Sequence, residues 1–157
     1  MATEYDPAGR VAGVKKEAGD YYVGAIASDA SNRIQYAAHG AVSAMKLGNG
    51  WWEHSNFNAR LQPIQIGLGT TSSNSTTLRL DYTYGSSNNN GNVLSQRIVV
   101  GSMDVTQSYD YDELNRLQKA EEKLTDSPFT SQWKQSFTYA RLCTKIRGEK
   151  DNAALRC

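Results

Sequence analysis

The chain lacks several features that would place it in a well-defined class. Its 157 residues contain no apolar run approaching the ~18 that suggest a membrane helix, so no membrane span is expected. The first five residues lack the basic-then-apolar pattern of a secretory leader. A formal net charge of +1 provides no strong field toward nucleic acid or a lipid surface. We therefore predict neither a nucleic-acid partner nor a transmembrane segment.

Cysteine and histidine are too sparse to suggest a metal or redox centre. Cys143 and Cys157 both lie near the end of the chain, and no Cys-x-x-Cys motif is present. We favour free thiols, with a disulfide between these two residues as the alternative. His39 and His54 have no further ligand in register, whereas zinc sites are built from larger clusters. No metal and no cofactor are predicted.

Large apolar residues and proline are also scarce, while aromatic residues of one kind are abundant. Only three prolines and three phenylalanines occur, against nine tyrosines and three tryptophans. Many of the remaining residues are Gly, Asn, Ser and Thr. This composition is typical of half-buried strands joined by polar turns. The sequence therefore predicts an all-β chain of consecutive antiparallel hairpins without a large core.

The most informative feature that is present is a motif that occurs twice. Residues 5–11 read Tyr-Asp-Pro-Ala-Gly-Arg-Val, and residues 111–117 read Tyr-Asp-Glu-Leu-Asn-Arg-Leu. An Asp at the start of a turn can accept hydrogen bonds from the backbone N–H groups ahead of it. Gly and Asn, which share the fifth position, are the residues that best tolerate positive φ. The residues expected to form these turns are Tyr5, Asp6, Gly9, Arg10, Tyr111, Asp112, Asn115 and Arg116.

Weaker copies of the motif lie between and after the two full ones. One copy keeps Tyr36 and Gly40, and residues 57–61 look like a shortened version that ends in Arg-Leu. Residues 82–85 keep the aromatic and glycine part, and residues 137–139 begin another copy. The aromatic anchors of the motif are then residues 5, 36, 57, 82, 111 and 139. This irregular spacing falls in the range of about 20–50 residues found in repeat proteins.

Alternation of apolar and polar residues predicts several strands. They cover residues 41–47, 51–57, 78–84, 93–100 and 105–111. The polar cluster at residues 86–92, with Asn90-Gly91 near its end, predicts a hairpin connection between two of them, and residues 48–50 (Gly-Asn-Gly) predict another. Residues 116–124 are compatible with a strand or a helix, because three consecutive charged residues weaken the strand pattern.

These stretches together resemble the RHS/YD-repeat family. The resemblance covers roughly residues 4–139 and rests on the two full motifs, on residues 48–51 and 57–63, and on residues 82–93. Members of that family fold as β-hairpin strips that wind into a hollow shell, as in insecticidal toxin-complex subunits, bacterial polymorphic toxins and the teneurins of animals. Their shells enclose an unfolded or toxic C-terminal polypeptide, or serve in contacts at the cell surface.

The resemblance implies a structural role rather than an enzymatic one. Residues 1–139 would form a YD-repeat strip, part of a shell around a C-terminal cargo or toxin, and the chain would be a fragment of a longer polypeptide. Its partners would be the neighbouring repeats, an encapsulated toxin or a cell-surface glycan, and the parent protein would be secreted or belong to the cell envelope. Residues 140–157 depart from the pattern and form a basic tail, interpreted as disordered, variable or out of frame.

Two other functions compete with this interpretation. Exposed aromatic residues on strands can stack on sugars, and the candidates for glycan contact are Trp51, Trp52, Tyr82 and Tyr84. The carboxylates at residues 104, 110, 112 and 113 are close enough in sequence to suggest acid–base catalysis. A role in the turn explains Asp112 without catalysis, and no Gly-x-Ser-x-Gly motif indicates a serine nucleophile. We therefore predict no catalytic residues.

Overall fold

A computed structural model describes residues 1–17, 19–24, 30–126 and 128–139. In that part of the chain every regular element is a β-strand, apart from one short 3₁₀ turn, η1 (Ala30–Asn32). The strands are β1 (Ala2–Tyr5), β2 (Val11–Lys15), β3 (Tyr21–Gly24), β4 (Gln35–Tyr36), β5 (Val42–Lys46), β6 (Trp52–Phe57), β7 (Pro63–Gly69), β8 (Leu78–Thr83), β9 (Ser95–Val100), β10 (Met103–Tyr111), β11 (Leu117–Leu124) and β12 (Ser131–Ser136). The prediction of an all-β chain is confirmed.

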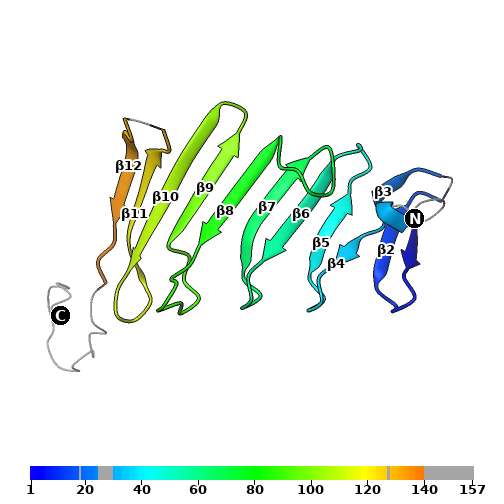
Figure 1. The fold of residues 1–157 in the computed structure, drawn as a ribbon, viewed down its shortest axis with the longest axis horizontal. Coiled ribbons are helices and arrows are strands. Elements are labelled where there is room, and N and C mark those ends of the chain that lie inside the picture. The colour runs from blue at the N-terminus through cyan, green and yellow to red at the C-terminus, as the bar shows by residue number, and fades with distance from the viewer. Residues whose placement is uncertain (18, 25–29, 127, 140–157) are drawn as a thin grey trace, which may run out of the picture.

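The strands follow one another across the molecule in the order of the sequence (Figure 1). Strands β4 to β12 form a nine-stranded antiparallel sheet, and β1 to β3 form a three-stranded one. The two sheets meet where Val23 bridges Leu47 and the N–H of Gly48 donates to the carbonyl of Tyr22 at 2.8 Å. The result is a strip of consecutive hairpins one sheet thick, in which each strand contacts mainly its neighbours in sequence.

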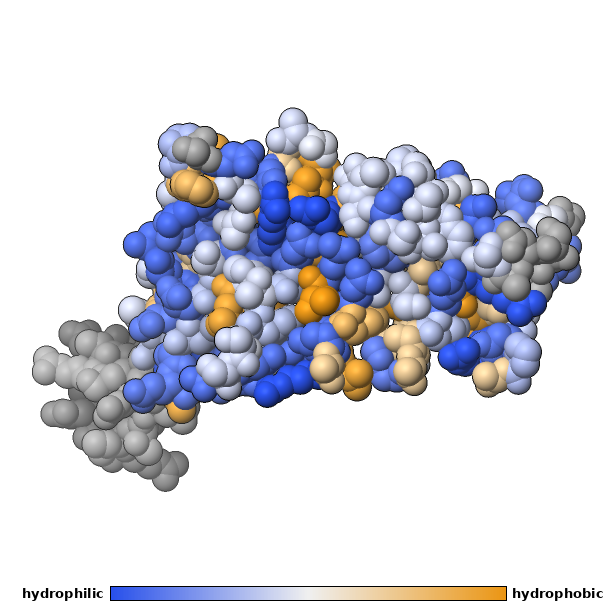
Figure 2. Space-filling view, viewed as in Figure 1, coloured by the Kyte–Doolittle hydropathy of each residue, from blue (hydrophilic) through white to orange (hydrophobic). Residues whose placement is uncertain are grey.

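The strand register separates the sheet into an apolar and a polar face. Ile66 pairs with Leu80, and Leu80 pairs with Ile98, so their side chains share one face because partners in a ladder point the same way. The adjacent positions Arg79 and Arg97 point to the opposite face. The face turned to the viewer in Figure 2 is mostly hydrophilic, with scattered hydrophobic groups.

A single layer cannot enclose an apolar core. Among the described residues, the buried hydrophobic side chains are Ala12, Ala44, Trp52, Val105 and Ala120. The apolar face stays open to solvent, with Val100 at 42% and Met103 at 47% exposure. Within the described ranges, the strip therefore has no second layer against which a sheet normally buries its hydrophobic face.

The observed strands and connections agree with most of the sequence expectations. Residues 117–124 form a strand, β11, which resolves the choice between strand and helix. Residues 48–50 lie in the predicted turn between β5 and β6. The hairpin predicted around Asn90-Gly91 is also present, and its connection is a long loop at residues 84–94 that joins β8 to β9.

Some expectations fall outside the part of the chain that is described. The basic tail at residues 140–157, with Cys143 and Cys157, is not among the described residues. Within the described ranges, no helix has the length and apolar character needed to cross a membrane.

Candidate functional site

Five turns along the chain share one backbone hydrogen-bond pattern. The N–H of the first residue donates to the carbonyl of the fifth, and the N–H of the fourth donates to the carbonyl of the first. These turns span residues 6–10, 37–41, 47–51, 58–62 and 112–116. The fourth residue always has positive φ: 76° at Gly9, 89° at Gly40, 90° at Gly50, 64° at Leu61 and 60° at Asn115. Glycine adopts this conformation freely and asparagine tolerates it, whereas leucine is strained in it.

Four of these turns lie along the same edge of the strip, the lower edge in Figure 1. The loop at residues 84–94 lies between the third and fourth of them. We call this edge the turn edge; it consists of residues 6–10, 37–41, 58–62, 84–94 and 112–116. The turn at residues 47–51 lies on the opposite edge, because successive hairpin connections alternate between the two edges of a meander.

Asp6 holds the first turn through both of its carboxylate oxygens. Oδ1 accepts hydrogen bonds from the backbone N–H groups of Ala8 and Arg10, at 2.9 Å each. Oδ2 accepts one from Arg10 Nε at 2.8 Å and lies 2.8 Å from Arg10 Nη2. Asp112 makes the same set of contacts with the residues two and four positions ahead, at 2.7–2.9 Å. The two full motifs thus form two turns with the same structure, although their second, third and fourth residues differ.

These contacts also determine the charge of the two carboxylates. The backbone hydrogen bond from Arg10 is the main cause that lowers the pKa of Asp6, and the side-chain bond from Arg116 is the main cause for Asp112. Both side chains therefore remain ionised acceptors near neutral pH. A general acid needs the opposite shift, toward a raised pKa.

The turn at residues 58–62 corrects the alignment of the third copy. This copy is complete rather than shortened, because Asn58 occupies the position of Asp6 and its Oδ1 accepts from the N–H groups of Arg60 and Gln62, at 2.9 and 3.0 Å. Asn58 Nδ2 donates to Gln62 Oε1 at 2.8 Å, which replaces the Asp–Arg ion pair by an amide pair. Leu61 takes the position of the glycine, so the Arg-Leu sequence is not the end of the motif.

Tyrosines of later hairpins contact the backbone of the hairpin before them. Four tyrosines, which we call the anchor tyrosines, each donate their hydroxyl to a carbonyl of the preceding repeat. The pairs are Tyr36 to Val11 at 2.6 Å, Tyr84 to Pro63 at 3.0 Å, Tyr111 to Val93 at 2.9 Å and Tyr139 to Leu117 at 2.7 Å. Three of the acceptors, Val11, Pro63 and Leu117, directly follow the turns at residues 6–10, 58–62 and 112–116. These four contacts join hairpins through side chains in addition to the strand pairing, and the Tyr36 contact also links the three-stranded sheet to the nine-stranded one.

Ring contacts reinforce the same connections. In both full motifs the arginine guanidinium lies over the ring of the next anchor tyrosine, 4.5 Å from the centroid of Tyr36 and 4.3 Å from that of Tyr139. The turn at residues 37–41 has no arginine, and there His39 packs edge to face against Phe57 at 4.6 Å. Cation–π contacts of this kind contribute roughly 0.5–1 kcal/mol at exposed sites.

The asparagine-rich loop at residues 84–94 fills the gap between two turns of the turn edge. On one side Asn89 exchanges two hydrogen bonds with Gln62, at 2.7 and 3.1 Å. On the other side Asn115 Oδ1 accepts from Asn90 at 2.6 Å and from Asn92 at 3.1 Å. The loop therefore connects the turn at residues 58–62 to the turn at residues 112–116 through side-chain amides.

The candidate glycan contacts do not form one platform. Trp52 is 8% exposed and pairs with Gly69 on the polar face, whereas Tyr82 lies on the apolar face. The hydroxyl of Tyr84 is bonded to the backbone as an anchor, and Trp51 is half-buried in the turn between β5 and β6. The anchor of this repeat is thus Tyr84 rather than Tyr82, which makes the spacing from residue 57 to 84 equal to that from 84 to 111.

A buried histidine lies on the polar face under the loop that follows β7. His54 is 3% exposed, and its Nε2 is 3.2 Å from Ser75 Oγ. Within the described residues His54 Nδ1 has no hydrogen-bond partner, so no carboxylate orients the ring as in a catalytic triad. A Cβ at Gly67 would overlap the His54 ring, and one at Gly69 would overlap Asn74. These contacts pack the loop closely onto two glycines of β7.

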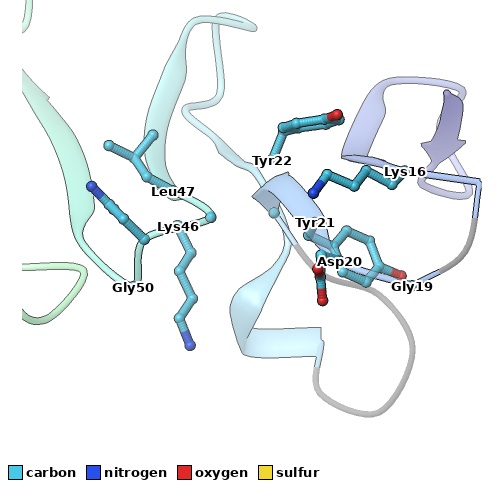
Figure 3. A pocket seen from close by; sticks show the side chains of 11 residues that line it. Lys16, Gly19, Asp20, Tyr21, Tyr22, Lys46, Leu47 and Gly50 are labelled. Carbon is cyan, nitrogen blue, oxygen red and sulfur yellow. The ribbon is translucent and has the colours of Figure 1, made fainter.

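A groove lies between the connection from β2 to β3 and the turn from β5 to β6 (Figure 3). Its volume is about 870 Å³, and it is broadly open to solvent. Lys16 extends toward the ring of Tyr22, 5.8 Å from the centroid, while Lys46 points away from both and donates to Asn32 Oδ1 at 3.3 Å. The groove brings together no set of groups suited to bond-making chemistry.

Neither a scan against protein-family models nor a search of curated proteins finds a match to this chain. In the described ranges, no three His, Cys, Asp or Glu side chains gather as a metal site would require.

The hydroxyl-to-carbonyl contacts of the anchor tyrosines were not predicted from the sequence. The spacing of the tyrosines was the available signal, but their carbonyl acceptors have no side-chain signature.

Proposed function

We propose that this chain is a non-enzymatic structural segment of an RHS/YD-type shell, which encloses a C-terminal cargo or toxin polypeptide. The observation that supports this most is the set of contacts along the turn edge. Each of the four anchor tyrosines bonds to the hairpin before it, so these hairpins depend on a neighbour for their packing. Such nearest-neighbour dependence is how repeat architectures are stabilised.

The two faces of the strip differ in polarity, as expected for the wall of a hollow shell. One face has the apolar side chains around Leu80 and Ile98, and the other has the ion pairs of Arg97 with Asp104 and of Arg79 with Asp81. A wall separates an inside from an outside and needs two surfaces of different character. A wall of this kind requires further strands on both edges, because open edges otherwise pair with other chains. The parent polypeptide would be secreted or part of the cell envelope.

Two of the four carboxylates considered for catalysis, Asp104 and Asp112, have structural partners. Asp104 accepts from Arg97 Nε at 2.8 Å, and Asp112 holds its turn. Arg97 is the main cause that lowers the pKa of Asp104, to about 2, which keeps this side chain ionised rather than available as an acid. These roles favour a structural protein over a hydrolase.

The proposed function is tested by the full reading frame from which this chain derives. We expect that frame to continue with more Tyr-Asp-x-x-Gly copies, and that its product, examined by single-particle electron microscopy, forms a closed hollow β-shell with a polypeptide inside. The control is the same product truncated after the first repeats, which should leave the shell open. A frame without further copies, or a product that remains an open sheet, would contradict the proposal.

A further inference from the structure

We propose that Tyr5 and the free edge of β1 form a docking site for one further hairpin, whose turn carries an arginine. This inference rests on the proposed function and specifies which partner the strip binds at this end. The partner is a hairpin with an Asp-x-x-(Gly or Asn)-Arg turn, followed by a residue whose carbonyl accepts the hydroxyl of Tyr5.

Tyr5 is the counterpart of an anchor tyrosine, but its hydroxyl has no partner within the described part of the chain. It precedes Asp6 as Tyr111 precedes Asp112, and Tyr111 donates its hydroxyl to the carbonyl of Val93 at 2.9 Å. The Tyr5 side chain is 61% exposed, and among the described residues its hydroxyl makes no hydrogen bond. The tyrosines that follow it as anchors all donate to a preceding repeat. Tyr5 therefore presents the same donor without the acceptor that the other copies have.

The strand that carries Tyr5 has a free edge without the usual protection. Among the described strands, β1 is the outermost of its sheet and pairs only with β2 (Figure 1). Natural edge strands are commonly protected by lysine, proline or an unpaired inward charge. β1 (Ala2–Tyr5) has no lysine or proline, and its one charge, Glu4, is bonded to Lys15 and Tyr21. Its backbone can therefore accept another strand without burying an unpaired charge.

The chemistry of the missing partner follows from the pairs that are present. Arg10 lies over Tyr36, and Arg116 lies over Tyr139, in each case from the turn that precedes the anchor. The same arrangement at Tyr5 needs a guanidinium and a carbonyl from a preceding turn. A strand without such a turn could pair with β1 but would leave Tyr5 exposed.

The test extends the full chain with a hairpin of its own sequence. A second copy of residues 103–134 is placed before Met1, which puts Tyr5 as far from the added arginine as Tyr139 is from Arg116. Tyr5→Phe is made in both the extended and the original chain, with Tyr22→Phe as control, because Tyr22 is 52% exposed and lies on β3. A further variant of the extended chain replaces the added arginine by alanine.

In the extended chain we expect Tyr5→Phe to lower the thermal midpoint by about 2–4 °C, and the alanine variant to lower it similarly. In the original chain Tyr5→Phe should have no effect, and Tyr22→Phe should have none in either. Amide hydrogen exchange in β1 should slow on extension.

Two results would overturn the docking site. One is an equal effect of Tyr5→Phe in both chains; the other is amide exchange in β1 that does not slow on extension. Either result leaves the proposed shell function intact, since that depends on the full reading frame. Conversely, a frame without further repeats would not change the result of this comparison.

Discussion

Single side chains determine how each hairpin is joined to the next. The hydroxyl of an anchor tyrosine satisfies a carbonyl of the preceding repeat, and at Tyr36 and Tyr139 the arginine of the preceding turn also covers the ring. A carbonyl that loses its partner must find water or remain unsatisfied, so the contact matters even where the ring is only half-buried.

Tyr36→Phe tests one anchor without removing the ring. The variant loses the 2.6 Å hydrogen bond to Val11 but keeps the contact with Arg10. We expect the free energy of unfolding to fall by about 0.5–1.5 kcal/mol, measured by urea denaturation. Tyr22→Phe, at an exposed position, is the control and should change stability by less than about 0.5 kcal/mol. Equal effects of the two variants would argue against an anchoring role.

Asp104 makes the strip sensitive to acid. Its pKa is lowered to about 2 in the folded chain, against about 3.9 for an unfolded aspartate. Stability from this carboxylate is therefore complete above about pH 4 and is lost as the pH falls toward 2. Asp104→Asn should cost about 0.2–1 kcal/mol at pH 7, because Arg97 is 37% exposed and solvent screens the pair.

The stability difference between Asp104→Asn and the original chain should disappear by about pH 2, measured by denaturation at several pH values. Asp110→Asn is the matched control, since Asp110 is 66% exposed and lies 3.8 Å from Lys119. A constant difference across this pH range would show that the aspartate acts through packing rather than through its charge.

At the scale of elements, one turn conformation recurs with different sequences. Residues 37–41 adopt it without any aspartate, and residues 58–62 adopt it with leucine at positive φ. The backbone bonds and the strand pairing on either side are therefore sufficient to form the turn, and the aspartate adds to them. The turn therefore forms even in sequences that no longer match the Tyr-Asp-x-x-(Gly or Asn)-Arg pattern.

Leu61→Gly and Asn115→Gly separate backbone strain from side-chain bonding. Leu61 has φ of 64° and is 55% exposed, so glycine should relieve strain and raise the free energy of unfolding by about 0.5–1 kcal/mol. Asn115 has φ of 60° but accepts bonds from Asn90 and Asn92, so glycine there should lower stability. Chemical denaturation of both variants measures the difference; shifts in the same direction would contradict it.

Particular residues show how far the sequence was informative. The alternation at residues 78–84 and the glycine at residue 50 predicted a strand and a turn, because local patterns specify local backbone. The third motif copy was misaligned, since Leu61 at positive φ is held by its neighbours and not by its own preference. The partners of Tyr84 and Tyr111 could not be predicted, because a backbone carbonyl is offered by every residue. Long-range contacts of this kind depend on register, which the variable repeat lengths conceal.

At the scale of the whole molecule, both the apolar face and the two edges of the strip are exposed to solvent. In the part of the chain that the structure describes, it has one layer, a half-exposed apolar face, and edge strands β1 and β12 whose outer backbone groups have no strand partner. The side chains along β12 (Ser131–Ser136) are all exposed. A strip of this shape gains stability when further strands or copies cover its edges.

The central claim, that this chain is one piece of a larger β-wall, is tested most directly by its behaviour as the concentration changes. Sedimentation velocity and thermal unfolding of the full chain should be followed over a wide range of concentration. We expect self-association, with an unfolding midpoint that rises as the concentration increases, because association covers the open edges. A sharp, reversible unfolding of a monomer, with the same midpoint at every concentration, would contradict the account.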